Sequence, residues 1–169
     1  MIIEWVCPLC GDSMITTGER QAPVCKYHGA GENPEMEFRG RRYSMAGFPA
    51  MKIAVDFDGT VVDQCYPRIG PDVPYAVVTL QELCKKHRII LNTMRSGKEL
   101  SDAVRWMREN EITLFGIQSD PEQHGWTESM KCYADVHIDD RGFGMPLIKP
   151  PGFVRPCVDW LAVRKMFDM

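Results

Sequence analysis

The fold class is decided by one stretch of the chain, Lys52-Ile53-Ala54-Val55-Asp56-Phe57-Asp58-Gly59-Thr60. Its first six residues, 52–57, have the apolar character of a short buried strand. Residues two apart point the same way in a strand, so we expect Asp56 and Asp58 to face one cavity. Gly59 then lets the backbone turn tightly away from the sheet. Two neighbouring carboxylates favour a bound divalent cation or a shared proton, and the competing interpretation is a polar loop that caps a following helix.

Strand-like and helix-like segments alternate from this stretch onward. The predicted strands are 52–57, 88–93, 113–117, 135–139 and a short one at 145–148, and the predicted helices are 74–87, 98–109, 127–133 and 158–167. This alternation predicts an α/β fold, a Rossmann-like parallel sheet with right-handed βαβ units and helices on both faces. Such sheets bind ligands at the carboxyl ends of their strands, where Asp56, Thr93 and Asp139 are expected.

Four short motifs follow one another in an order that is typical of one enzyme group. They are an Asp-x-Asp-Gly-Thr segment, a strand-ending Thr, a Lys and an acidic pair: Asp56 to Thr60, Thr93, Lys131 and Asp139-Asp140. In this order they resemble the haloacid dehalogenase (HAD) superfamily, most of whose members are Mg²⁺-dependent phosphatases. The resemblance covers about residues 51–148, and the segments 66–70 and 138–141 look like a short, capless subgroup.

The resemblance implies a mechanism that the residue types support. Asp56 would attack phosphorus and form an aspartyl-phosphate. Asp58 would protonate the leaving oxygen and then activate the hydrolytic water. A catalytic Mg²⁺ would be held by Asp56, by the backbone carbonyl of Asp58 and by the pair Asp139 and Asp140, of which either could be the direct ligand.

The same resemblance implies that Thr93 and Lys131 bind the phosphoryl oxygens, and Lys98 is a weaker candidate for the role of the lysine. Arg95 either adds a bidentate phosphate contact or is the solvated start of the next helix. Neither 60–93 nor 93–131 has room for a folded cap domain. An open site of this kind favours a large substrate, or a lid that another part of the protein supplies.

The amino-terminal segment carries a different pattern of metal ligands. Cys7 and Cys10 form one pair and Cys25 and His28 another, with 14 residues between the pairs. Three sulfurs and one imidazole predict a closed, structural Zn²⁺ site, whose binding would supply folding free energy to a small module that resembles a zinc ribbon or knuckle. The alternative is a set of reduced, buried cysteines with His28 at the surface, and an iron–sulfur site is disfavoured.

The role of this module follows less directly from its residues. The run Arg39-Gly40-Arg41-Arg42-Tyr43 could meet phosphates, but residues 1–50 contain five basic and six acidic residues. Nucleic acid is therefore not the favoured partner, and our hypothesis is that the module restricts access to the open site. We expect two domains, a zinc-binding module with its linker at 1–48 and a HAD-like α/β domain at 49–169.

Composition narrows the class of protein further. The 169 residues carry a net charge of −3, so a strongly basic nucleic-acid binder is unexpected. The apolar runs are too short for a membrane span, Cys7 interrupts any signal-peptide core, and seven unevenly spaced cysteines do not suit a secreted disulfide framework. We therefore expect a cytoplasmic protein with no membrane partner, and the oligomeric state stays open.

The function predicted from these residues is Mg²⁺-dependent hydrolysis of a phosphomonoester, with a nucleotide or other small phosphorylated metabolite as substrate. One alternative is a nucleic-acid end-processing phosphatase that holds the strand with the zinc module. A second is a non-catalytic binding protein that kept the fold, although the presence of all the acids and Thr93 argues against it.

Overall fold

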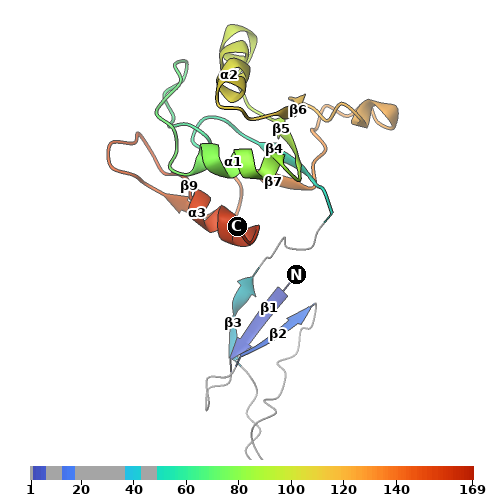
Figure 1. The fold of residues 1–169 in the computed structure, drawn as a ribbon, viewed down its shortest axis with the longest axis vertical. Coiled ribbons are helices and arrows are strands. Elements are labelled where there is room, and N and C mark those ends of the chain that lie inside the picture. Colours follow the sequence, from blue (N-terminus) through green and yellow to red (C-terminus); the bar gives the residue numbers. More distant parts are fainter. Residues whose placement is uncertain (1, 7–12, 18–36, 43–48) are drawn as a thin grey trace, which may run out of the picture. The chain divides into compact units, whose positions relative to one another are not determined.

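The computed structural model describes residues 2–6, 13–17, 37–42 and 49–169. The chain divides into two compact units: one comprises Met1–Ala46 with Lys165–Met169, and the other comprises Gly47–Arg164. Each unit is described by itself, and Figure 1 labels most of their strands and helices.

The first unit contains a three-stranded antiparallel sheet. Its strands are β1 (Ile2–Val6), β2 (Ser13–Thr17) and β3 (Glu37–Arg42), in the order β2-β1-β3. The pairing of β1 with β3 shifts register between Glu4 and Trp5. The four predicted zinc ligands, Cys7, Cys10, Cys25 and His28, lie outside the described residues, in the segments between β1 and β2 and between β2 and β3.

The second unit is built on a four-stranded parallel sheet. Its strands are β4 (Lys52–Val55), β5 (Arg88–Leu91), β6 (Leu114–Ile117) and β7 (Val136–Ile138), in the order β6-β5-β4-β7. The middle strands are almost fully apolar because both faces of the sheet are covered: Ile53, Val55, Ile89 and Leu91 have no exposed surface. The predicted parallel sheet flanked by helices, and with it the α/β class, is confirmed (Figure 1).

Three helices belong to the α/β part of the chain. They are α1 (Ala76–Cys84), α2 (Gly97–Glu109) and α3 (Trp160–Met166). α1 buries Leu80 and Leu83, and α2 buries Ala103 and Met107, as expected for amphipathic helices that cover a sheet. Among the described residues, no helix combines the length and the apolar character needed to cross a lipid bilayer.

The predicted helix at 127–133 is wrong. A one-turn 3₁₀ helix, η1 (Gln123–Gly125), occurs instead, followed by an irregular loop. The side chains of Thr127 and Ser129 accept hydrogen bonds from backbone N–H groups two residues further on, and such local bonds compete with helix formation. Cys132 from this loop packs against Ala54 and Ile90 and so covers the sheet where a helix was expected.

The predicted strand at 145–148 pairs differently from the expectation. β8 (Leu147–Ile148) pairs antiparallel with β9 (Cys157–Val158), and the two form a separate small sheet. The segment 149–156 between them contains Pro150, Pro151 and Gly152, which favour a turn over a continued strand. This turn brings residue 155 to the carboxyl edge of the parallel sheet, as described below.

Candidate active site at the carboxyl ends of the strands

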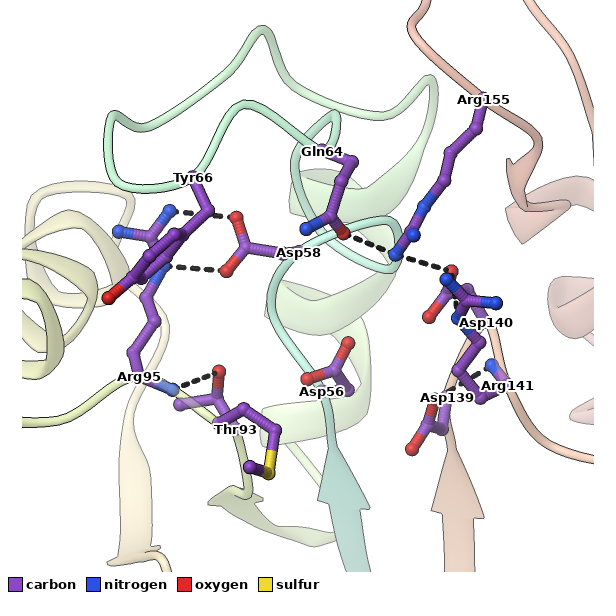
Figure 2. Close-up of a pocket in the computed structure, with 11 residues that line it drawn as sticks. Asp56, Asp58, Gln64, Tyr66, Thr93, Arg95, Asp139, Asp140, Arg141 and Arg155 are labelled. Carbon is purple, nitrogen blue, oxygen red and sulfur yellow. Dashed lines mark hydrogen bonds and ion pairs between the residues drawn. The ribbon is translucent and has the colours of Figure 1, made fainter.

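A cavity of about 450 Å³ lies at the carboxyl ends of β4, β5 and β7. Figure 2 shows Asp56 directly above β4 and Asp139 above β7, with Thr93 and Arg95 facing them from the loop after β5. The lining residues are Asp56, Asp58, Gln64, Tyr66, Thr93, Met94, Arg95, Asp139, Asp140, Arg141 and Arg155. The structure thus brings together all the predicted residues of the α/β domain except Lys131.

Three carboxylates form the acidic centre of this cavity. Asp56, Asp139 and Asp140 each offer one oxygen, and these oxygens all lie within 4.8 Å of one another. Asp56 and Asp139 come close because β4 and β7 are neighbours: the N–H of Asp56 donates to the carbonyl of Ile138 at 3.0 Å. Carboxylate oxygens grouped at this spacing are the ligands that Mg²⁺ prefers. Asp58 does not belong to this group through its side chain.

Thr60 ties the first loop to the acidic pair. Its hydroxyl donates to Asp56 Oδ2 at 3.2 Å and accepts the backbone N–H of Asp140 at 3.0 Å. Its carbonyl accepts the indole N–H of the fully buried Trp160 at 2.7 Å. Gly59 has a φ of +85°, and a Cβ at this position would lie 2.7 Å from Asp140 Oδ2. The close approach of the two loops therefore requires glycine here.

Burial and like charge shift the protonation of this centre. Burial raises the pKa of Asp56 to about 7, and the neighbouring charges of Asp139 and Asp140 add to the rise. Burial also raises the pKa of Asp140, although the guanidinium groups of Arg155 and Arg141 oppose it. Negative charge in this cluster is therefore costly, and a nearby cation would offset it.

Asp58 is engaged by Arg95 through two parallel hydrogen bonds. Arg95 Nε lies 2.6 Å from Asp58 Oδ2, and Nη2 lies 2.7 Å from Oδ1. The same guanidinium donates to the carbonyls of Pro67 and Arg68 and lies over the rings of Phe57 and Tyr66. Arg95 is only 1% exposed, so the solvated-helix interpretation of this residue is wrong. Most of its N–H donors already bind acceptors within the protein, so Arg95 holds Asp58 and the loop of Pro67 and Arg68 in position.

The loop after β5 is held in place by one glutamine. Gln118 accepts the backbone N–H of Thr93 at 2.9 Å and donates to the carbonyls of Thr93 and Arg95. Thr93 itself is 8% exposed and its hydroxyl accepts the N–H of Arg95. The predicted phosphate ligand at the end of this strand therefore lies in a fixed position at the cavity wall. Gln118 follows β6 as Thr93 follows β5, and we did not select it from the sequence.

The structure does not bring Lys131 to this cavity. Lys131 is exposed, and its carbonyl accepts a hydrogen bond from Gln123, whose side chain also binds the N–H of Asp120. Asp120 in turn pairs at 2.6 Å with the ammonium of Lys52, the first residue of β4. Lys131 therefore lies near the amino ends of the strands, because the loop that was expected to be helical takes this path.

Five lining residues, like Gln118, were not predicted as site residues. They are Gln64, Tyr66, Met94, Arg141 and Arg155. Arg155 Nη2 lies 3.3 Å from Asp140 Oδ2, and Arg141 Nε lies 3.5 Å from the same oxygen. Arg141 directly follows the acidic pair and could have been found by that position, whereas no local pattern singles out Arg155.

Comparison with known proteins supplies a family but no activity. No protein-family model matches the chain, and no curated protein matches it. A solved structure of a conserved protein from Bacteroides thetaiotaomicron is similar, with 41% sequence identity and a TM-score of 0.56. The match covers 69% of this chain and 88% of that one. The chain therefore belongs to the same family as this conserved Bacteroides thetaiotaomicron protein.

Proposed function

We propose that the protein is a Mg²⁺-dependent phosphomonoester hydrolase of the HAD type. The observation that carries the proposal is the convergence of Asp56, Asp139 and Asp140 within 4.8 Å at the floor of a cavity. The same cavity presents the hydroxyl of Thr93 and the guanidinium of Arg155, which suit phosphoryl oxygens. Carboxylates for a cation beside donors for an anion are the combination that phosphoryl transfer needs.

The donor set fits magnesium. Asp56, Asp139 and Asp140 offer hard oxygen ligands, and the raised pKa of Asp56 reflects buried negative charge that a cation would offset. Bound there, Mg²⁺ would neutralise charge on the phosphoryl oxygens and on the nucleophile. Either member of the acidic pair offers an oxygen to the group, so both are proposed as ligands.

The protein residues would act in two steps. An oxygen of Asp56 attacks phosphorus, the bond from phosphorus to the ester oxygen breaks, and the departing alcohol takes up a proton. Water then attacks the aspartyl-phosphate at phosphorus, which releases inorganic phosphate and restores the Asp56 carboxylate. Asp58 is the proposed carrier of the proton in both steps because it lines the same cavity. One of its two bonds to Arg95 must be exchanged for the substrate or the water during the transfer.

An activity screen tests the proposal. We expect the full chain to hydrolyse at least one class among nucleoside monophosphates, sugar phosphates and phosphorylated oligonucleotide ends when Mg²⁺ is present. Chelation with EDTA should abolish the activity and excess Mg²⁺ should restore it, because the acidic cluster alone repels a phosphate dianion. Hydrolysis that persists at the same rate after complete chelation would contradict the proposal, as would the absence of activity on every class.

Magnesium affinity should depend on pH through Asp56. The carboxyl must lose its proton to bind the cation, and its pKa in the metal-free protein is raised to about 7. Affinity should therefore weaken about tenfold for each pH unit below 7 and level off above it. The stability of the metal-free protein should change in the opposite direction. The protonated Asp56 contributes to the free energy of unfolding at low pH, and this contribution is lost as pH rises through about 7.

Isothermal titration calorimetry with Mg²⁺ across this pH range measures the pH dependence of Mg²⁺ affinity. Thermal unfolding of the metal-free protein measures the pH dependence of its stability. In the Asp56→Asn variant, the part of the pH dependence below about pH 7 that Asp56 causes should disappear from both measurements. Equal Mg²⁺ affinity of the unmodified protein at about pH 5.5 and about pH 8 would show that Asp56 is not a ligand with a raised pKa.

A further inference from the structure

We infer that Arg155 binds the phosphoryl group of the substrate and the inorganic phosphate that is released, in the role that the sequence assigned to Lys131. The inference deepens the proposed function and rests on it. It identifies the anion-binding residue of this chain as an arginine on the turn between β8 and β9, far along the chain from the four motifs.

The other cations considered for this role, Arg95, Arg141 and Lys131, are unsuited to it. Arg95 lines the cavity but spends its donors on Asp58 and on two backbone carbonyls. Arg141 has a side chain that is 68% exposed, so its charge is well screened by solvent. Lys131 is exposed and lies near the amino ends of the strands. Arg155 is the remaining cation among the described lining residues.

One N–H donor of Arg155 has no acceptor among the described residues. Its Nη2 approaches Asp140 Oδ2 at 3.3 Å and also donates to Gln64 Oε1, as Figure 2 shows. Its Nε is buried, and none of the described residues accepts a hydrogen bond from it. A buried donor without an acceptor is unfavourable, and a small rotation of this side chain, which is 32% exposed and lines the cavity, would bring Nε to an acceptor that the protein does not itself supply. A phosphoryl oxygen is such an acceptor, and the planar guanidinium matches phosphate well.

The backbone around Arg155 is anchored on both sides by hydrogen bonds. The N–H of Val154 donates to the carboxylate of Asp63, which is itself 2% exposed. The N–H of Val158 donates to the carbonyl of Gly59 at 3.0 Å. Both anchors lie on the loop that follows Asp56, so the turn that carries Arg155 is fastened to the loop of the proposed nucleophile. A residue whose backbone is held in this way can position a phosphoryl group without a large loss of backbone entropy.

Binding of inorganic phosphate tests the inference separately from catalysis. Calorimetric titration of the full chain with phosphate, in the presence of Mg²⁺, would compare the unmodified protein with Arg155→Gln, Arg155→Lys and the control Arg108→Gln, an exposed arginine on α2. We expect Arg155→Gln to weaken phosphate binding about 10- to 100-fold. Arg155→Lys should recover part of the loss because it restores the charge, and the control should bind as the unmodified protein does.

The Mg²⁺ affinity of Arg155→Gln distinguishes two roles for Arg155. In the first Arg155 binds phosphate directly, and in the second it only supports Asp140. We expect Arg155→Gln to bind Mg²⁺ at least as tightly as the unmodified protein when phosphate is absent, because the substitution removes a cation that lies 3.3 Å from Asp140. Unchanged phosphate affinity in folded Arg155→Gln would overturn the inference, and so would a loss of phosphate binding explained entirely by weaker Mg²⁺ binding.

The outcomes also distinguish this inference from the proposed function. If the unmodified protein hydrolyses phosphomonoesters and Arg155→Gln binds phosphate normally, only the inference fails. If the unmodified protein binds phosphate through Arg155 but hydrolyses no ester, the proposed function fails and the binding role of Arg155 stands. A folded, Mg²⁺-loaded protein that binds no phosphate would overturn the inference.

Discussion

Replacing Asp56 with Asn is expected to reduce phosphomonoester hydrolysis by about 10⁴-fold or more, which is the scale of loss when an enzyme loses its nucleophile. The amide has the shape of the carboxylate but cannot form the acyl-phosphate bond, and it is a poorer ligand for Mg²⁺. The fold should tolerate the change, since a neutral amide does not carry the desolvation cost that raises the pKa of Asp56 to about 7. Above pH 7 the metal-free variant should unfold at the same temperature as the unmodified protein or at a higher one.

The measurement is kcat/KM on the best substrate of the screen, with thermal unfolding as the check on folding. Asp102→Asn is the matched control because Asp102 lies on α2 and pairs there with Lys98 and Arg105, outside the cavity. The control should keep its activity. An Asp56→Asn protein with activity within about tenfold of the unmodified protein would exclude Asp56 as the nucleophile and would favour a non-covalent mechanism.

Truncating Trp160 to Ala should lower the free energy of unfolding by about 3–5 kcal/mol, as observed for buried aromatic residues. Trp160 has no exposed surface, and its indole N–H donates to the carbonyl of Thr60. Trp160→Phe keeps much of the packing and loses the hydrogen bond, so about 1–2 kcal/mol is expected. Since Thr60 contacts both Asp56 and Asp140, Mg²⁺ affinity should fall in both variants.

Urea unfolding of the metal-free proteins measures these differences. Leu161→Ala serves as the control on the same helix, because Leu161 is 45% exposed and its truncation should cost less than about 1 kcal/mol. A Trp160→Ala variant no less stable than Leu161→Ala would show that the anchoring of Thr60 contributes little. Unchanged Mg²⁺ affinity in Trp160→Phe would show that the hydrogen bond between Trp160 and Thr60 does not influence the acidic cluster.

The carboxyl edge of the sheet was predictable because its residues follow buried strands. Asp56, Thr93 and Asp139 could be placed together from strand order alone, since parallel strands end at a common edge. The structure confirms the parallel sheet itself and brings these side chains to one cavity. Their chemistry, from the bound cation to the phosphorylated substrate, stays a prediction, as does the zinc site of residues 7–28.

The remaining features depend on contacts between distant parts of the chain. Asp58 and Arg95 pair across 37 residues, and Arg155 meets Gln64 across 91, so no local pattern encodes either contact. The error at 127–133 has another cause: the hydroxyls of Thr127 and Ser129 offered the backbone an alternative to helical bonds. That loop carries Lys131 away from the cavity, and Arg155, the anion-binding residue that we propose instead, has no local sequence signature.

The bond between Trp160 and Thr60 spans 100 residues, and this separation has a consequence during synthesis. A nascent chain exposes the acidic loop early, but the segment that braces it leaves the ribosome much later. Closing so long a loop costs more conformational entropy than forming a helix or a pair of neighbouring strands, and the contact therefore forms more slowly. A nascent chain that has not yet exposed residue 160 would therefore hold these carboxylates in an unbraced loop, and the braced arrangement of Asp56 and Asp140 would form only after Trp160 has left the ribosome.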